Sequence, residues 1–113
     1  MGEGEEKDLL SYMQKKIDEG LQDPETKKKI EGWNRIVQLT LKSGEKYIFE
    51  VKDGNITVKE GEVENPDMRI EIDRETLIGL FEGTKSAAWA LIRRKMKVKG
   101  SLSDVLKLKQ IFK

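Results

Sequence analysis

The 113-residue sequence contains no cysteine and no histidine. The first absence excludes disulfides, thiolate nucleophiles and thiolate metal sites, and the second removes the commonest general base and the commonest metal ligand. The sequence also lacks a glycine-rich phosphate loop and a nucleophile motif. It therefore predicts no catalytic residue, no metal site and no cofactor, and we expect the protein not to be an enzyme.

Long apolar runs are missing too, because no stretch approaches the ~20 residues of a membrane-spanning helix. The acidic start, residues 1–7, lacks the basic and apolar regions of a secretory signal. We therefore expect a cytoplasmic protein. With 38% charged and 36% hydrophobic residues, the chain is typical of one globular domain, residues 1–113.

The charges are distributed unevenly, although the net charge is only +1. Residues 93–113 hold eight basic residues and one acid, so this segment carries +7 and the rest of the chain −6. Such a segment is a candidate surface for anionic membranes, lipid headgroups or nucleic acids. Few aromatic residues lie among these basic residues, which disfavours nucleic-acid binding.

Hydrophobic spacing predicts helices in the first 32 residues and strands after them. Residues 9–21 have apolar positions at helical spacing, and Asp23-Pro24-Glu25 is a typical helix start. Between residues 35 and 59 apolar and polar residues alternate, with turns at Ser43-Gly44 and Asp53-Gly54. This alternation predicts a three-stranded meander with one apolar face and one solvated face.

The second half predicts two more strands and three more helices. A fourth alternating strand ends at Asp73, which is placed to cap a helix, and Thr84 is placed to cap the next one. The fifth strand, residues 95–99, precedes a helix that Ser101 caps. The predicted fold is α+β: a five-stranded, mostly antiparallel sheet with one solvated face and four to five helices on the other.

Five short motifs occur in a particular order along nearly the whole chain. They are Val51-Lys-Asp-Gly54, Asn65-Pro66-Asp67, Phe81-Glu-Gly83, Lys95-Met-Lys-Val-Lys-Gly100 and Leu106-Lys-Leu108. Their order and spacing resemble the sterol carrier protein type two domain. The resemblance implies a free-standing, prokaryote-like, intracellular member whose helices and sheet enclose an apolar tunnel. It also implies non-enzymatic binding and carriage of a fatty acid, a fatty acyl-CoA or a sterol-like ligand.

Three positions depart from this family. Arg94 stands where the family usually has glycine, so we expect the turn before the last strand to be made differently. Asp104 and Lys109 stand where familiar members have an apolar and a glutamine-like residue. The chain ends Ile111-Phe112-Lys113, without the peroxisomal address common in eukaryotic members, which leaves the ligand class open.

We expect the binding site to be formed mainly by the last three helices, where large apolar residues gather. The lipid-binding candidates are Leu77, Phe81, Trp89, Ile92, Leu102, Val105, Leu106 and Phe112, and the headgroup candidates are Arg93, Arg94 and Lys109. A slot between such helices and a sheet suits an acyl chain, since each buried methylene contributes ~0.8 kcal/mol. For any one of these apolar residues ordinary core packing is the more common role, and for the basic ones a solvated strand edge is.

Three functions remain open at this point. The favoured one is a carrier for a long-chain lipid or acyl-CoA, with an anionic membrane surface as a further partner. The second is an accessory module that presents a lipid to a separate enzyme. The third is a basic surface that binds nucleic acid or protein, which the alternation of lysines with Met96 and Val98 in one strand disfavours. The ligand and the oligomeric state are left undetermined.

Overall fold

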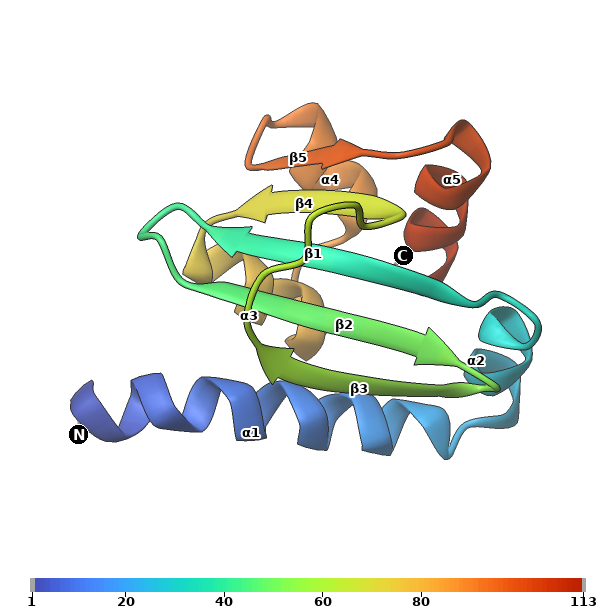
Figure 1. The fold of residues 1–113 in the computed structure, drawn as a ribbon, viewed down its shortest axis with the longest axis horizontal. Coiled ribbons are helices and arrows are strands. Elements are labelled where there is room, and N and C mark those ends of the chain that lie inside the picture. The colour runs from blue at the N-terminus through green and yellow to red at the C-terminus, as the bar shows by residue number, and fades with distance from the viewer. Residues whose placement is uncertain (1, 113) are drawn as a thin grey trace.

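The computed structural model describes the backbone of residues 2–112 and the side chains of residues 9–112. Helices and strands follow one another in the order expected from the hydrophobic spacing (Figure 1). They are α1 (Gly2–Leu21), α2 (Pro24–Ile30), β1 (Arg35–Leu41), β2 (Lys46–Lys52), β3 (Asn55–Glu60), β4 (Met68–Ile72), α3 (Arg74–Glu82), α4 (Ala87–Ile92), β5 (Met96–Lys99) and α5 (Leu102–Ile111).

The five strands form one sheet in the order β3-β2-β1-β4-β5. Strand β1 pairs antiparallel with β2 and parallel with β4. The β2–β3 and β4–β5 pairings are both antiparallel. The parallel pair requires the chain to return from β3 across the sheet, and Figure 1 shows the segment 61–67 crossing in front of β1 and β2. The predicted α+β fold with a mostly antiparallel sheet is confirmed.

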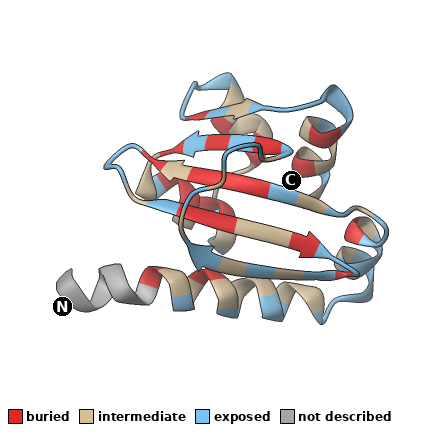
Figure 2. Cartoon of the chain, in the orientation of Figure 1, coloured by how far each residue is buried: buried red, intermediate tan, exposed pale blue. Residues whose placement is uncertain are grey.

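The inner face of the sheet carries the apolar half of every strand. In register, Val37 of β1 lies opposite Phe49 of β2 and beside Met68 of β4, and Ile72 lies opposite Met96 of β5. These side chains share one face because successive residues of a strand point to opposite sides. Figure 2 shows the buried positions concentrated in the central strands and in the helix surfaces turned toward them.

The outer face of the sheet is covered where the segment 61–67 crosses it. Gln38, which the alternation placed on the solvated face, is only 2% exposed. Its side-chain amide donates to the carbonyl of Gly61 at 3.1 Å, and its Oε1 accepts from the amide of Val63 at 2.7 Å. A buried polar side chain needs such partners. Gln38 therefore fixes the crossing segment to the sheet, and the neighbouring Ile48 of β2 is buried on the same face.

Short polar side chains start four of the helices. Asp23, Asp73 and Ser101 accept hydrogen bonds from first-turn amides of α2, α3 and α5, as the sequence predicts. The prediction for α4 was wrong by two residues, because Ser86 and not Thr84 accepts from the amide of Trp89. The hydroxyl of Thr84 donates instead to the carbonyl of Gly79 in the preceding helix.

Helices α3 and α4 end in the same kind of turn with different residues at its left-handed position. Gly83 follows α3 with φ +81°, and Arg94 follows α4 with φ +59°. In both turns two successive backbone amides bond back to carbonyls of the last helical turn, the Schellman arrangement that favours glycine. The expectation that Arg94 changes the turn was therefore wrong, since arginine adopts the conformation that glycine would have.

In the described part of the chain, no helix is both long enough and apolar enough to cross a membrane.

Candidate functional site

An apolar cavity of about 260 Å³ lies between the inner face of the sheet and the helices. Its volume is just below the ~300–1,000 Å³ typical of small-molecule sites. Helices α1, α2, α3 and α5 and all five strands contribute residues to the wall, and nearly every contribution is hydrophobic. The lining residues are Lys16, Ile17, Gly20, Leu21, Thr26, Ile30, Trp33, Val37, Leu39, Phe49, Val51, Ile56, Met68, Ile70, Ile72, Leu77, Leu80, Phe81, Met96, Leu108, Ile111 and Phe112.

The wall brings together both ends of the chain. The second half of α1 contributes Ile17 and Leu21, and α2 contributes the fully buried Ile30. A further part of the wall is formed by α3 and the end of α5, where the rings of Phe81 and Phe112 meet edge to face with centroids 5.6 Å apart. The contribution of α1 and α2 was not predicted, although the apolar spacing of residues 9–21 indicated that α1 buries one face.

Three of the eight predicted lipid-binding residues, Leu77, Phe81 and Phe112, line the cavity. The other five lie outside its wall: Trp89, Ile92, Leu102, Val105 and Leu106. Ile92 ends α4 with 79% of its side chain exposed, and Leu102 begins α5 with 75% exposed. Trp89 borders a shallow surface hollow, where the Lys85 ammonium lies 5.3 Å from its ring centroid. A role of these residues in lipid binding stays a prediction.

The rotation of α5 explains why Leu102, Val105 and Leu106 of its expected apolar face do not line the cavity. The buried residues of this helix are Asp104 and Leu108, four positions apart and hence on one side. Leu102 and Leu106 consequently face solvent, while Leu108 and Ile111 point to the cavity. The sequence predicted the orientation of α5 from its apolar residues, whereas in the structure the buried carboxylate of Asp104 orients this helix.

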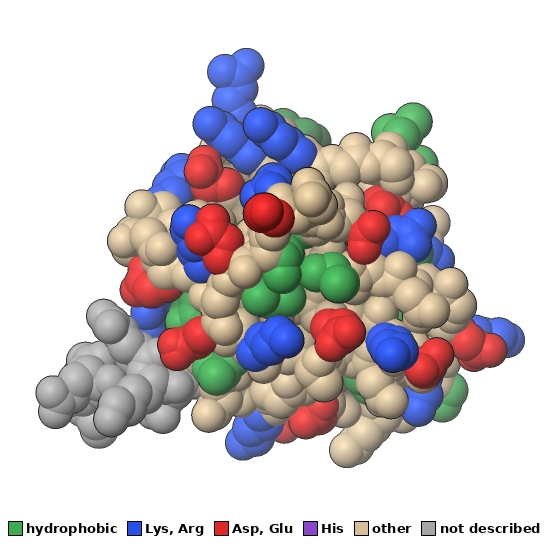
Figure 3. Space-filling view, viewed as in Figure 1, with side chains coloured by type: hydrophobic (Ala, Val, Ile, Leu, Met, Phe, Trp, Pro, Cys, Tyr) green, Lys and Arg blue, Asp and Glu red, His purple; other side chains and the backbone are tan. Residues whose placement is uncertain are grey.

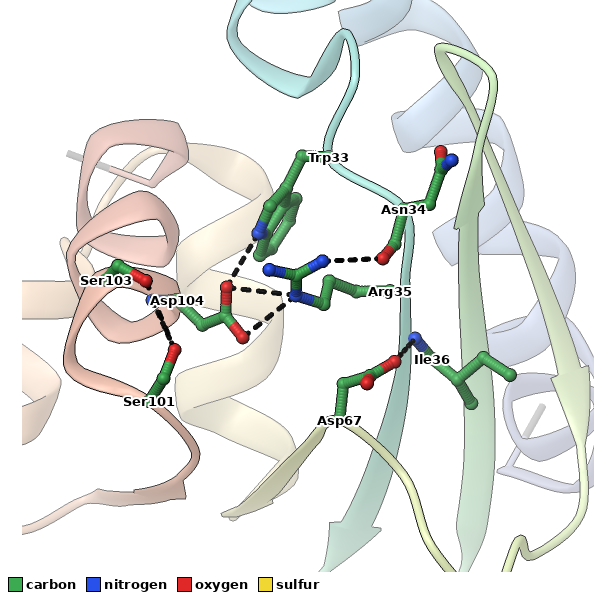
Figure 4. Close-up of polar contacts among 8 residues, drawn as sticks. All are labelled: Trp33, Asn34, Arg35, Ile36, Asp67, Ser101, Ser103 and Asp104. Carbon is green, nitrogen blue, oxygen red and sulfur yellow. Dashed lines mark hydrogen bonds and ion pairs between the residues drawn. The ribbon is translucent and has the colours of Figure 1, made fainter.

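Asp104 belongs to a polar cluster that joins α5 to the start of β1 (Figure 4). Its carboxylate accepts from Trp33 Nε1 at 2.8 Å and from Arg35 Nε at 3.0 and 2.9 Å. Burial raises the pKa of Asp104, but the hydrogen bonds from Arg35 and Trp33 outweigh it and hold the pKa below its usual value. Because Trp33 also lines the cavity, this cluster fixes one of the cavity walls.

The C-terminal end of α5 is held by hydrogen bonds to two of its backbone carbonyls. The amide of Ala87 donates to the carbonyl of Phe112 at 2.8 Å, and Lys29 Nζ donates to the carbonyl of Gln110 at 3.2 Å. These bonds place the aromatic ring of Phe112 over the cavity beside Phe81.

The predicted headgroup residues do not lie at this cavity. Arg93 and Arg94 are exposed in the turn before β5, and Lys109 is half-buried on α5 outside the wall. Among the side chains that the structure describes, the one charged group in the lining is Lys16 of α1. Sequence reasoning missed it. The signal was its helical spacing from Met13 and Gly20, which puts Lys16 on the apolar face of α1.

A second polar cluster surrounds Lys16. Its ammonium lies 3.3 Å from Glu82 Oε2 at the end of α3, and the hydroxyl of Tyr12 donates to the same carboxylate. Burial and the hydrogen bond to Glu82 together raise the pKa of Tyr12 to about 12. Hydrogen bonds from Tyr12 and Lys16 lower the pKa of Glu82, so this carboxylate is ionised near neutral pH.

The chemistry of the cavity is that of an apolar binding site. No group of three or more metal-ligating side chains occurs among residues 9–112. The wall offers hydrophobic surface, one hydroxyl from Thr26 and one ammonium from Lys16. Such a lining suits a flexible apolar chain, with an anionic or polar group at one end.

The chain is similar to lipid-carrier sequences and structures. The sequence profile of the SCP-2 sterol transfer family matches residues 14–113. Sterol carrier protein domain 2 of Helicoverpa armigera has a TM-score of 0.71 at 21% identity, covering 91% of this chain and 84% of that one. Palmitated SCP2L2 from Aedes aegypti has a TM-score of 0.59 at 23% identity, with 70% and 72% covered.

A domain of a much longer enzyme has the same fold. A stereoselective inverting sec-alkylsulfatase from Pseudomonas sp. matches with a TM-score of 0.64 at 12% identity, over 76% of this chain. The chain spans only 14% of the length of that sulfatase. No curated protein sequence matches the chain.

Proposed function

Because the chain belongs to the SCP-2 sterol transfer family, which binds and transfers lipids, we propose that it carries one long-chain lipid with the tail in the cavity. The observation that carries this proposal is the lining of the cavity, which is apolar except for Lys16 and Thr26 among the described side chains. The protein holds and releases the lipid without transforming it. A fatty acid or a fatty acyl group is the ligand that suits this lining best.

The energy of binding comes from burying the tail. Each methylene removed from water contributes ~0.8 kcal/mol, so a chain of ordinary fatty-acid length gains on the order of 10 kcal/mol before ordering costs are subtracted. That gain supports micromolar binding without a specific hydrogen bond. The cavity of about 260 Å³ is small for such a ligand, so its wall has to move outward on binding.

The last turn of α5 is the part of the wall best placed to move. Leu108 and Ile111 of this turn and the adjacent Phe112 line the cavity. The Asp104 cluster holds the first turn, whereas the last turn is held by hydrogen bonds to the carbonyls of Phe112 and Gln110 and by the packing of Leu108 and Phe112. A helical turn held by few hydrogen bonds opens at little cost to the rest of the fold.

Delivery to and from anionic membranes is a second part of the proposal. Basic side chains gather around the α4–β5 turn and β5, at the top of the molecule in Figure 3. Arg93, Arg94 and Lys95 are exposed there, beside the 79% exposed side chain of Ile92. Basic groups with an adjacent exposed apolar residue suit the surface of an anionic bilayer, and binding should weaken as salt is added.

Presentation of the bound lipid to a separate enzyme is a second candidate. The occurrence of this fold as 14% of an alkylsulfatase favours it, since the fold there is one part of an enzyme. Both candidates require the same loaded cavity, so they share one first experiment.

That experiment is native mass spectrometry of gently purified protein, combined with analysis of an organic extract. We expect a discrete added mass that matches an extracted fatty acid or related lipid. Loading with hexadecanoate and dodecanoate then tests the cavity directly. Leu77→Trp places a larger side chain in the wall and should abolish loading, whereas Ile92→Trp alters an exposed side chain and should not.

Two results would contradict the proposal. One is a folded protein that takes up neither fatty acid, and the other is equal loading of the two tryptophan variants. For the membrane step, sedimentation with vesicles of anionic lipid should fall on Arg93→Glu and stay unchanged on Lys28→Glu, an exposed lysine of α2 remote in sequence from β5.

A further inference from the structure

Lys16 is an exception in the cavity wall. Its companions there from α1, Ile17, Gly20 and Leu21, carry no charge, and it is the one charged group in the wall among the described side chains. Lysine on an apolar helix face normally extends its stem over hydrophobic surface and keeps its ammonium in water. The position of Lys16 therefore marks where the cavity meets solvent.

The ammonium of Lys16 is partly exposed and already holds an anion. Its side chain is 31% exposed, and Nζ lies 3.3 Å from Glu82 Oε2, whose side chain is 43% exposed. The pair joins α1 to α3, and both helices contribute residues to the cavity wall. A carboxylate from a tail-bound ligand would reach the same ammonium at the edge of the cavity.

Glu82 can give up Lys16 at small cost. The hydroxyl of Tyr12 also donates to Glu82, so the carboxylate keeps one hydrogen-bond donor when Lys16 turns to a ligand. Its partial exposure supplies water for the remaining acceptor positions. Partly exposed ion pairs of this kind contribute little net stability, and exchanging one carboxylate for another leaves the charge of Lys16 paired.

We propose that Lys16 binds the carboxylate of a fatty-acid ligand in exchange for Glu82, so that the cavity selects an anionic amphiphile over a neutral one of equal length. This inference rests on the proposed lipid-binding function and adds the headgroup position to it. Glu82 acts as an internal competitor that occupies Lys16 when the cavity is empty. The assignment replaces Arg93, Arg94 and Lys109 as the headgroup contact.

The alternative role of Lys16 is purely structural, as a tie between α1 and α3. The two roles predict different changes in ligand affinity for one substitution. Glu82→Gln removes the competing charge but keeps an acceptor for Tyr12, so it frees Lys16 for the ligand. A structural tie predicts weaker or unchanged ligand binding in this variant, whereas headgroup binding predicts a gain.

The test measures dissociation constants for dodecanoate and dodecanol near neutral pH, for the full chain and three variants. Lys16→Met keeps the apolar stem and removes the charge, and should weaken dodecanoate binding about fivefold while leaving dodecanol unchanged. Glu82→Gln should strengthen dodecanoate binding by a few fold. Lys15→Met is the matched control, because Lys15 is exposed on the same helix and outside the wall, and neither constant should change.

Three outcomes overturn the inference. Equal weakening of both ligands by Lys16→Met would show that the side chain only shapes the wall. No change for either ligand in Lys16→Met would remove Lys16 from the site, and weaker or unchanged dodecanoate binding in Glu82→Gln would identify the pair as a structural tie. If the unaltered chain binds neither ligand, the proposed function itself fails, which separates that failure from the others. Circular dichroism of each variant checks that the fold is retained.

Discussion

Replacing Arg94 with glycine should stabilise the fold, although it deletes an entire charged side chain. Arg94 has φ +59°, in the left-handed region where a Cβ atom crowds the following carbonyl. The side chain of Arg94 is exposed, and it forms no hydrogen bond or ion pair with any residue that the structure describes. The substitution therefore relieves backbone strain and breaks no contact of the folded state.

The expected gain is about 1 kcal/mol. Relief of the left-handed conformation contributes ~1–2 kcal/mol, and the greater freedom of glycine in the unfolded chain offsets ~0.4–1 kcal/mol of that. An entropy of unfolding of ~2.1 cal/mol/K per residue makes about 240 cal/mol/K for this chain. A gain of about 1 kcal/mol then raises Tm by about 4 °C.

Thermal and urea denaturation followed by circular dichroism would measure this gain, and two variants serve as controls. Arg94→Ala removes the same charge but keeps the strained Cβ, so its Tm should change by no more than a degree or two. Gly83→Ala introduces the strain in the matching turn, where a Cβ would meet no atom within 4 Å, and should cost about 1 kcal/mol. Equal stabilisation by Arg94→Ala and Arg94→Gly would refute the reasoning, because relief of charge repulsion would then be the cause.

Two further predictions concern carboxylates with lowered pKa values. Asp104→Asn weakens the hydrogen bonds to Trp33 and Arg35 and should cost about 2 kcal/mol in urea unfolding. Because the folded-state pKa of Asp104 is depressed, its contribution is complete above the usual Asp pKa of about 4 and is lost as the pH falls below it, so the two proteins should converge in acid. A constant difference from neutral pH down to acid would contradict this assignment. Asp73→Ala removes the cap of α3 and should cost about 1 kcal/mol in the same assay, and an unchanged midpoint would show that the cap contributes nothing.

Local features of the sequence were sufficient to predict the helices and strands. Alternation with period two identified the strands, and Asp23, Asp73 and Ser101 begin their helices as expected. These signals act over a few residues, because a capping side chain bonds to an amide only two or three positions away. The misplaced cap at Thr84 lies two residues from Ser86, so two suitable side chains competed within one short stretch.

The candidate site was predicted only in part, because its wall depends on contacts between residues far apart in the chain. Leu77, Phe81 and Phe112 were identified by their size and helical position, and they line the cavity. Lys16 was missed, since its relevance depends on Glu82, 66 positions later in sequence. Nothing within α1 alone shows that α3 will lie opposite it.

The sequence alone was enough to predict the order of the elements, the apolar face of each strand, most helix starts and the likeness to a lipid-carrier family. The side of α5 that faces the cavity depends instead on long-range contacts, because Asp104 is oriented by Trp33 and Arg35 about 70 positions away. The burial of Gln38 likewise depends on a distant part of the chain, the segment that crosses the outer face of the sheet. Hydrophobic periodicity shows that a face is buried, but a cavity and the group at its opening arise from how separate elements are packed together.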